Sequence, residues 1–453
     1  MMFTRVLVAN RGEIAVRVVR ALHELGIEAV AVYSTADRDA LHVELADQAV
    51  CIGPPPAAES YLRIPNIVAA AETTGSQAVH PGYGFLAENP AFVRACEDSD
   101  LVFIGPPAEV MERMGDKVRA KEEMRAAGTP LVPGTDGTAA LDAVRRAARE
   151  AGFPVFLKAA AGGGGKGMRV VRSEDELEGA YAAASAEAEA AFGDGSLYLE
   201  KVLWPARHVE IQVLCDAEGG VLTLGERECS IQRRHQKLIE ESPSPALDEE
   251  TRVEMETAVA RACAAIGYRN AGTFEFLLGP GGSFHFIEAN CRLQVEHPVS
   301  EAVAGIDLVR EQVRLAAGER LELTGRAPRR GHAIEIRINA EDPARGFAPA
   351  PGTVTRFRPP LGAGVRVDTA IREGSEIPPY YDSLVAKVIV WDETRPAAIA
   401  RTARALSDLE VEGISTTREL ALDVLGSPEF LLGDYSTSTL AELRGRLPSL
   451  STA

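Results

Sequence analysis

Carboxylate and amide side chains alternate with phenylalanines along two neighbouring predicted strands. Glu275 lies in GTFEFLL (272–278), Glu288 and Asn290 lie in FHFIEAN (284–290), and the intervening GPGGS is typical of a hairpin. Asn290 is two residues beyond Glu288, so both side chains point to the same face of their strand. Mg²⁺ prefers hard oxygen ligands and leaves coordination positions for phosphate and water, so these residues are a candidate magnesium site. A hairpin with a solvated acidic face would show the same pattern.

A cation and a carboxylate follow this hairpin in RLQVEHP (292–298). Arg292 could hold an oxyanion with its planar fork of donors, and Glu296 could accept a proton. A bicarbonate ion needs both functions, because its charge must be held and its proton removed before it attacks or as it does so. Taken alone, the heptapeptide also fits a polar loop that ends at a proline.

A glycine-rich turn, GGGGKG (162–167), joins two further predicted strands. Without Cβ atoms, its backbone N–H groups could approach phosphate oxygens, and Lys158 on the preceding strand adds a cation. The turn is not a Walker A loop, because Ala160 and Gly167 stand where that motif needs Gly and Ser or Thr. A merely flexible turn is the alternative interpretation.

The elements that position these residues begin with an α/β pattern. Apolar runs at 5–9 and 29–33 flank a segment of helical periodicity, and a strand over 101–105 closes this unit, with a boundary near 115. The turn after the first strand lacks GxGxxG, which disfavours a nicotinamide dehydrogenase.

The middle of the chain predicts a small α+β lid inserted in a larger domain, and the pattern becomes strand-rich again from about 331. A third domain is expected there on length grounds. The predicted lid elements are strands at 153–159, 168–171, 197–203 and 208–216 with a helix over 175–192, and the later ones are strands at 333–339, 353–358, 365–370 and 384–390 with helices near 395–409 and 415–425.

Composition excludes several classes of function. The 453 residues include 48 Lys and Arg against 66 Asp and Glu, a formal charge of -18, which disfavours nucleic acid as a partner. Apolar runs fall far short of the roughly 20 residues that span a bilayer, and no signal segment is recognisable. The six cysteines form no CxxC pair, so we expect reduced thiols in a cytoplasmic protein without a membrane partner.

An ordered series of segments, from residue 4 to about 440, resembles the biotin carboxylase family. The segments are ANRGEIA (9–15), HPGYGFLAEN (80–89), MGDK (114–117), GGGGKGM (162–168), RHVEIQV (207–213), ERECSIQRRHQK (226–237), GTFEFL (272–277), QVEHP (294–298), RINAEDP (337–343) and PPYYDSL (378–384).

This resemblance implies an ATP-grasp protein of mixed α/β and α+β class. It implies a Rossmann-like, pre-ATP-grasp N-terminal domain over 1–115, an ATP-grasp domain over 116–330 with a lid at about 131–204, and a biotin carboxylase C-terminal domain over 331–445. The implied reaction converts ATP, bicarbonate and biotin into ADP, phosphate and carboxybiotin through carboxyphosphate. It would be the first half-reaction of an acetyl-CoA or other acyl-CoA carboxylase.

Carried over residue by residue, the resemblance also implies a role for individual side chains. The implied ATP-binding residues are Lys117, Lys158, Gly163, Gly164, Gly165, Met168, Glu200, Lys201, Leu203, His208, Gln232, His235 and Leu277. The implied ligands of Mg²⁺ or Mn²⁺ are Glu275, Glu288 and Asn290. Bicarbonate and biotin would be bound by Tyr83, Arg292, Gln294, Val295 and Arg337, and catalysis would use Glu296 as general base with Arg292, Arg337 and Lys237.

The biotin itself must be supplied by another polypeptide or segment, because no MetLysMet occurs in the sequence. The expected partners are a biotin carboxyl carrier protein or domain, a carboxyltransferase component and a second copy of the chain. Whether the chain is a stand-alone subunit or part of a longer acyl-CoA, pyruvate or urea carboxylase stays open. The rivals are another ATP-grasp carboxylate ligase and a non-catalytic ATP-binding subunit, although none of Glu296, Arg292 or the proposed metal ligands is missing.

Overall fold

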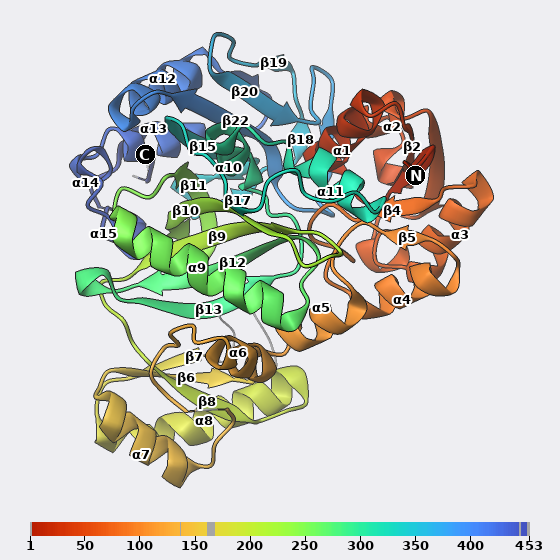
Figure 1. The fold of residues 1–453 in the computed structure, drawn as a ribbon. Helices are drawn as coiled ribbons and strands as arrows, with labels where there is room; N and C mark the ends of the chain where they lie inside the picture. Colours follow the sequence, from red (N-terminus) through yellow and green to blue (C-terminus); the bar gives the residue numbers. More distant parts are fainter. Residues whose placement is uncertain (1, 136, 161–167, 444, 451–453) are drawn as a thin grey trace.

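The computed structural model describes residues 2–135, 137–160, 168–443 and 445–450, and its N-terminal part is a five-stranded parallel sheet. The strand order is β3-β2-β1-β4-β5 (Figure 1), which confirms the predicted α/β opening. The predicted strand over 101–105 is reduced to β5, because Pro106 and Pro107 follow and cannot donate to a ladder. The elements are β1 (Arg5–Val8), α1 (Gly12–Glu24), β2 (Glu28–Ser34), α2 (Leu41–Leu45), β3 (Gln48–Gly53), α3 (Ile64–Thr74), β4 (Ala78–His80), α4 (Pro90–Asp98), β5 (Val102–Phe103) and α5 (Ala108–Gly115).

A separate lobe at the bottom of Figure 1 contains a three-stranded antiparallel sheet of order β7-β6-β8. Two helices cover it and share a small core of Val144, Leu157, Leu177 and Leu199 among others. This lobe matches the α+β unit predicted from the strand and helix pattern. Its elements are α7 (Leu141–Ala151), β6 (Val155–Ala159), β7 (Met168–Val171), α8 (Glu174–Phe192) and β8 (Leu197–Lys201), and the preceding helix α6 (Lys117–Ala126) packs against α5 and β13 of the main body.

The largest sheet has nine strands and runs from the middle of the chain into its C-terminal part. Its order is β13-β12-β9-β10-β11-β15-β22-β20, and β14 pairs with β10. Since β11 pairs antiparallel with β15, three strands beyond residue 331 (β15, β22 and β20) extend the central sheet, whereas the shorter ones form two-stranded sheets. The elements are β9 (Arg207–Cys215), β10 (Val221–Arg233), β11 (Gln236–Ser242), α9 (Glu249–Ile266), β12 (Asn270–Leu278), β13 (Phe284–Asn290), α10 (His297–Ala304), α11 (Leu308–Ala316), β14 (Gly325–Arg326), β15 (His332–Asn339), β20 (Val365–Thr369) and β22 (Leu384–Asp392).

The predicted single strand over 353–358 is wrong, because this segment divides between two partners. Val354 donates its N–H to Ser375 O, whereas Thr355 donates to Glu412 O. Successive N–H groups of an extended chain point to opposite edges, so the segment pairs with one strand before Val354 and with another after Thr355. The remaining elements are β16 (Glu341–Asp342), β17 (Ala348–Pro349), β18 (Gly352–Thr353), β19 (Arg356–Arg358), β21 (Glu376–Ile377), α12 (Arg395–Asp408), β23 (Glu410–Glu412), α13 (Arg418–Leu425), α14 (Pro428–Leu432) and α15 (Thr439–Leu443), with short 3₁₀ turns at Thr35–Asp37, Ala57–Glu59, Pro280–Gly282, Pro343–Arg345 and Pro448–Leu450.

The two faces of the large sheet differ in chemistry. On β15, Ile334, Ile336 and Ile338 enter an apolar core shared with α12 and α13. The alternate residues Glu335 and Arg337 therefore point to the opposite face, against which α10 packs. This polar, buried face is where the predicted reactive residues gather.

Candidate active site

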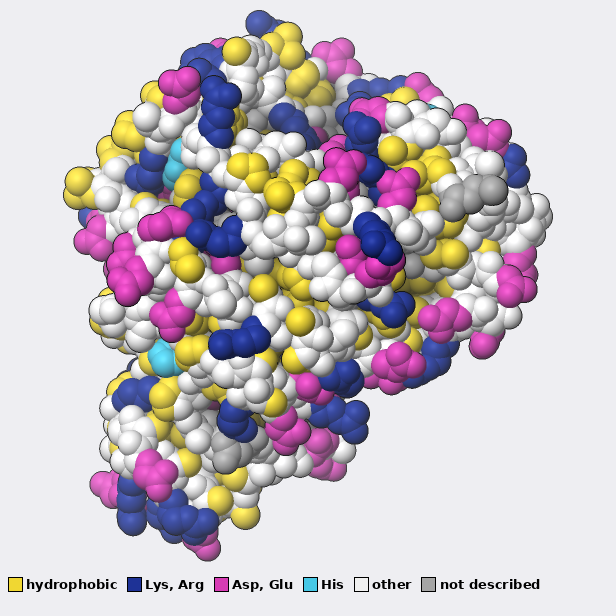
Figure 2. Space-filling model, in the orientation of Figure 1, with side chains coloured by type: hydrophobic (Ala, Val, Ile, Leu, Met, Phe, Trp, Pro, Cys, Tyr) yellow, Lys and Arg dark blue, Asp and Glu magenta, His cyan; other side chains and the backbone are white. Residues whose placement is uncertain are grey.

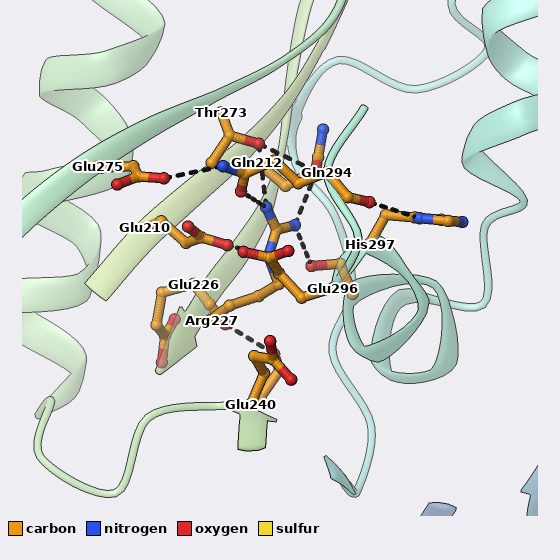
Figure 3. Close-up of polar contacts among 12 residues, drawn as sticks. Glu210, Gln212, Glu226, Arg227, Glu240, Thr273, Glu275, Gln294, Glu296 and His297 are labelled. Carbon is orange, nitrogen blue, oxygen red and sulfur yellow. Dashed lines mark hydrogen bonds and ion pairs between the residues drawn. The ribbon is translucent and has the colours of Figure 1, made fainter. Parts of the chain in front are cut away.

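A fully buried arginine, Arg227 on β10, joins the elements of the site. Its Nε donates to Glu210 Oε1 at 2.5 Å, Nη1 donates to Gln212 Oε1 and Ser300 Oγ, and Nη2 donates to Thr273 Oγ1 and Gln294 Oε1. Figure 3 shows these acceptors arranged around the guanidinium. All the donors of the guanidinium are thus used, which holds β9, β10, β12 and the start of α10 in one arrangement.

Lys237 on β11 lies among three buried carboxylates. Its Nζ is 2.6 Å from Glu210, 3.0 Å from Glu275 and 2.6 Å from Glu296. Burial disfavours the ammonium charge, but the carboxylates prevail and raise the pKa of Lys237 well above its usual value. Lys237 therefore carries a positive charge at the centre of the site.

Glu296 directly precedes α10 and is buried between two cations. Its Oε1 is 2.6 Å from Lys237 Nζ, and its Oε2 accepts from Arg337 Nη2 at 2.9 Å. Burial alone would raise the pKa of Glu296, yet the charges of Lys237, Arg337 and Arg227 lower it well below the usual value. The side chain is ionised and can accept a proton.

The residues of the candidate metal site lie together, as their spacing predicted. Glu275 and Glu288 are directly opposed across the β12–β13 hairpin, and Asn290 Nδ2 donates to Glu275 Oε1 at 2.9 Å. Despite burial, Lys237 and His208 lower the pKa of Glu275 well below its usual value, so its oxygens carry negative charge. The Glu288 side chain is exposed.

The residues predicted to hold bicarbonate surround this hairpin end. Arg292 donates from Nε to Glu88 Oε2 at 2.8 Å and from Nη2 to Asn290 Oδ1 at 2.9 Å. Gln294 Nε2 donates to Glu275 Oε1 at 2.8 Å, and the carbonyl oxygen of Val295 accepts from Lys387 Nζ. Arg292 and Glu296 therefore lie on the same side of the site, with Gln294 between them in the chain.

The lid lobe supplies other predicted ATP-binding residues. Lys158 on β6 and Lys121 on α6 both form ion pairs with the buried carboxylate of Glu200 on β8. Lys201 Nζ donates to the carbonyl oxygens of Gly152 and Phe153. Lys121 and Lys158 thus neutralise the charge of Glu200, and the ammonium group of Lys158 is held at that carboxylate.

The lid faces the metal-site hairpin. Burial and, after it, the charges of Glu200 and Glu288 raise the pKa of Tyr198 on β8. Leu131, at the start of the lid, forms a β-bridge with Phe286 on β13. Met168 begins β7 opposite Lys158, and Leu203 lies just beyond β8. Gly163, Gly164 and Gly165 lie outside the described residues.

Strands β9 and β12 and the β10–β11 hairpin carry other predicted ATP-binding residues. His208 Nε2 lies 2.7 Å from Glu275 Oε2, and although burial opposes the charge, Glu275 raises the pKa of His208. Gln232 is buried opposite Lys237 in the ladder. His235 lies at the hairpin tip, and burial together with the charges of Lys158 and His208 lowers its pKa. Half-buried Leu277 is paired with His208.

Lys117 is the first residue of α6, and Asp116 caps that helix. Asp116 Oδ1 accepts from the backbone N–H groups of Val118 and Arg119 at 2.9 and 3.0 Å. We expect Asp116→Ala to lower the free energy of unfolding by about 1 kcal/mol, because two helix donors lose their acceptor. Asp116→Asn should retain most of this contribution to the free energy of unfolding, since asparagine caps helices equally well. Urea unfolding of the variants measures this, and an equal loss in both would contradict the capping role.

Tyr83 contacts a buried ion pair formed by Glu13 and Lys387. Its hydroxyl donates to Glu13, and the Nζ of Lys387 lies 5.9 Å from the centre of its ring. Lys387 is also 3.2 Å from Glu13 and donates to Val295 O. Tyr83 is therefore connected to the bicarbonate residues through Lys387.

Sequence reasoning missed several residues of the site, among them Glu210, Arg227, Glu240 and Lys387. Each is a charged residue inside a strand and is completely buried. A charged side chain is costly to bury unless it is paired, so the lone lysine in the apolar run LVAKVIVW (384–391) was an available signal, whereas Arg227 and Glu240 stand beside other charged residues and gave none. The identity of the partners was not readable, because they lie on other strands.

Comparison with known protein families covers nearly the whole chain. The model of the biotin carboxylase N-terminal domain matches residues 2–111, and that of the biotin carboxylase C-terminal domain matches 335–442. Between them, the ATP-binding domain of the carbamoyl-phosphate synthase L chain matches 116–324. Within the described residues, no helix is both long and apolar enough to cross a bilayer.

Individual relatives agree with the family models. Biotin carboxylase of Nostoc sp. is 53% identical over 445 residues, which is 98% of this chain and 100% of the relative. The biotin carboxylase–β,γ-ATP complex of Campylobacter jejuni has a TM-score of 0.93 at 48% identity, covering 97% of this chain and 99% of that one. The biotin carboxylase domain dimer of Hydrogenobacter thermophilus 2-oxoglutarate carboxylase, bound to MgADP, ADP and bicarbonate, has a TM-score of 0.92 at 49% identity, covering 98% of each chain. The chain belongs to the biotin carboxylase family of ATP-dependent ligases, which carboxylate biotin with bicarbonate.

Proposed function

We propose that this chain carries out the first half-reaction of an acetyl-CoA or other acyl-CoA carboxylase, carboxylating biotin on a carrier protein or domain. The observation that carries the proposal is the ionised Glu296, buried between Lys237 and Arg337 and beside the Glu275–Asn290 hairpin end. A proton acceptor, two cations and hard oxygen ligands are the groups that activation of bicarbonate by ATP requires.

Three domains are proposed, over 1–115, 116–330 and 331–445, with a lid at about 131–204. The ranges matched by the family models support these boundaries. The antiparallel pairing of β11 with β15 would place the second and third domains on one sheet, so that residues from both could form a single site.

The donor set of Glu275, Glu288 and Asn290 fits Mg²⁺. Glu275 is ionised, Glu288 is exposed, and the Asn290 amide adds a neutral oxygen. The bound ion would neutralise polyphosphate charge. Lys117 and Lys158 would contact the phosphates, and Lys158 would then leave Glu200, because a polyphosphate offers the greater negative charge.

Arg292, Gln294, Val295 and Lys237 would hold bicarbonate beside the γ-phosphate. Glu296 would take the bicarbonate proton as a bicarbonate oxygen attacks the γ-phosphorus and ADP leaves, which gives carboxyphosphate. The N1′ of biotin would then attack the carboxyl carbon as the bond to phosphate breaks, the departing phosphate would take the N1′ proton, and Arg337 would stabilise the negative charge on the ureido oxygen. Because neighbouring cations lower its pKa, Glu296 would release the proton readily at the end of the cycle.

The acyl-CoA assignment rests on likeness to biotin carboxylases matched along their full length, such as that of Nostoc sp.. A 2-oxo acid carboxylase is the alternative, since the Hydrogenobacter thermophilus relative belongs to a 2-oxoglutarate carboxylase.

The Hydrogenobacter thermophilus domain is a dimer, and we propose a homodimer here too. A cytoplasmic location and a separate carboxyltransferase component stay predictions. In Figure 2, acidic and basic side chains are interspersed over the visible face.

Phosphate release from MgATP tests the reaction. We expect it to require bicarbonate, to rise on addition of free biotin, and to be accompanied by transfer of label from ¹⁴C-bicarbonate to biotin. Phosphate release that ignores both bicarbonate and biotin would instead favour another ATP-grasp ligase. Comparing kcat/KM for the biotinylated carriers of an acyl-CoA carboxylase and of a 2-oxo acid carboxylase tests the acceptor, and a preference for the second would overturn the acyl-CoA assignment.

A further inference from the structure

A row of buried ionisable side chains extends across the polar face of the large sheet, away from Glu296. Glu240 on β11 is directly opposite Glu335 on β15, and Arg337 is directly opposite Lys387 on β22. Glu240, Glu335 and Lys387 are 0% exposed. Burying this many ionisable groups is costly, and neither ATP nor bicarbonate binding, as proposed above, uses Glu240 or Glu335.

Arg337 is held between two carboxylates of different elements. Its Nε donates to Glu240 Oε1 at 2.6 Å, and its Nη2 donates to Glu296 Oε2 at 2.9 Å. Its Nη1 has no hydrogen-bond acceptor within the part of the chain that the structure describes. This atom is not fully buried, so it is open to solvent. The two carboxylates thus fix the plane of the guanidinium and leave one edge free for a ligand.

We propose that Glu240 is a positioning residue that keeps Arg337 aimed at the ureido oxygen of biotin while Glu296 carries the bicarbonate proton. The inference rests on the proposed function. Once Glu296 is protonated it is neutral, and its hydrogen bond with Arg337 loses its charge assistance. Glu240 is then the remaining anion on the guanidinium, and it holds Arg337 in place during transfer of the carboxyl group.

The groups around Glu240 determine the pH range in which it is ionised and can hold Arg337 in place. Within the described residues, the titratable and charged groups that face it are Arg337 and Glu335 from β15, Glu296 from the start of α10, Cys229 from β10, and Lys237 from its own strand. Burial, which the charge of Arg337 only partly offsets, raises the pKa of Glu240 to about 7. Burial raises the pKa of Glu335 well above its usual value, and neither of its oxygens has a hydrogen-bond partner among the described residues. Glu335 is therefore neutral, and Glu240 is the anion of the pair above about pH 7.

The test separates the biotin-dependent step from the earlier one. In Glu240→Gln and Glu240→Ala, we expect kcat for biotin carboxylation to fall by about ten- to a hundredfold, the usual effect of losing a residue that orients a reacting group. Phosphate release with bicarbonate alone should stay at the parent rate, and so should KM for ATP. Glu241→Gln is the matched control, because Glu241 is the next residue, equally buried, but paired with His332 and Arg395 on the other face. It should leave both rates unchanged.

The pH profile adds a readout that a purely structural role would not change. Glu240 with a raised pKa is ionised above about pH 7 and neutral below it. The parent rate of biotin carboxylation should therefore fall as the pH drops through that value, and Glu240→Gln, which is neutral throughout, should lack this limb. Equal loss of both activities in Glu240→Gln, or an unchanged acid limb, would overturn the proposal.

The variant Arg337→Ala distinguishes failure of the positioning role of Glu240 from failure of the proposed function. If Arg337→Ala keeps the parent rate of biotin carboxylation, the role given to Arg337 is wrong. If Arg337→Ala loses that rate while Glu240→Gln keeps it, only the positioning role of Glu240 is overturned.

Discussion

Glu296→Ala should lower biotin-stimulated phosphate release by about 10²- to 10⁴-fold, the range that a general base contributes. Glu296 is an ionised carboxylate that contacts both Lys237 and Arg337, and its low pKa keeps it unprotonated at neutral pH. Removing it leaves bicarbonate without a base and leaves two buried cations with one carboxylate fewer. MgATP binding should persist, because the proposed metal ligands and Lys158 are untouched.

Glu296→Gln is the second variant, because it preserves the volume and one hydrogen-bond acceptor but not the basicity. We expect it to be as slow as Glu296→Ala, and we expect both variants to bind MgATP with parent affinity by isothermal titration calorimetry. Full turnover in Glu296→Gln would remove Glu296 from the role of base. Loss of MgATP binding would show that the residue serves the architecture of the site instead.

Arg227→Met should lower the free energy of unfolding by about 3–5 kcal/mol, because it leaves the buried carboxylate of Glu210 with one cation fewer. Arg227 is fully buried and gives all its donors to the buried acceptors around it, on strands β9 and β12, on α10 and on the segment before α10. The methionine fills a similar volume, so the loss reports charge and hydrogen bonding more than a cavity. Chemical denaturation followed by circular dichroism measures it.

Arg94→Met is the matched control, because Arg94 is also paired with a glutamate, Glu112, but on the surface. Both side chains are largely exposed, at 47% and 40%. Water already solvates such a pair well, so this substitution should change stability very little. Comparable losses in Arg94→Met and Arg227→Met would contradict the importance of burial.

Local patterns in the sequence were enough to predict how the side chains of the β12–β13 hairpin are arranged. The period of two in β13 places Glu288 and Asn290 on one face, and the turn at 279–283 brings Glu275 opposite them. The structure shows this arrangement, with Asn290 donating to Glu275. The N-terminal βαβ pattern was equally local, since each strand is a short apolar run followed by a helix of recognisable period.

Resemblance to a family supplied the roles of the dispersed residues, such as Lys237 and Arg337, which no spacing could have connected. They are far apart in sequence but lie on neighbouring strands, because β11 pairs with β15. The same pairing joins predicted strands beyond residue 331 to the central sheet, which the strand pattern alone did not specify. Strand pairing over such distances depends on hydrogen bonds between segments whose partners a local pattern does not specify.

The sequence by itself determined the fold class and the residues that we propose as metal ligands and reactive groups. Only the tertiary structure decided their charges and their partners, as for Glu296 between Lys237 and Arg337 or Arg227 among its acceptors. A side chain's ionisation depends on how much water it loses and which charges it meets when distant strands close over it. Those two quantities come into existence with the packed sheet and α10, which is why Glu240 and Lys387 became visible as parts of the site only there.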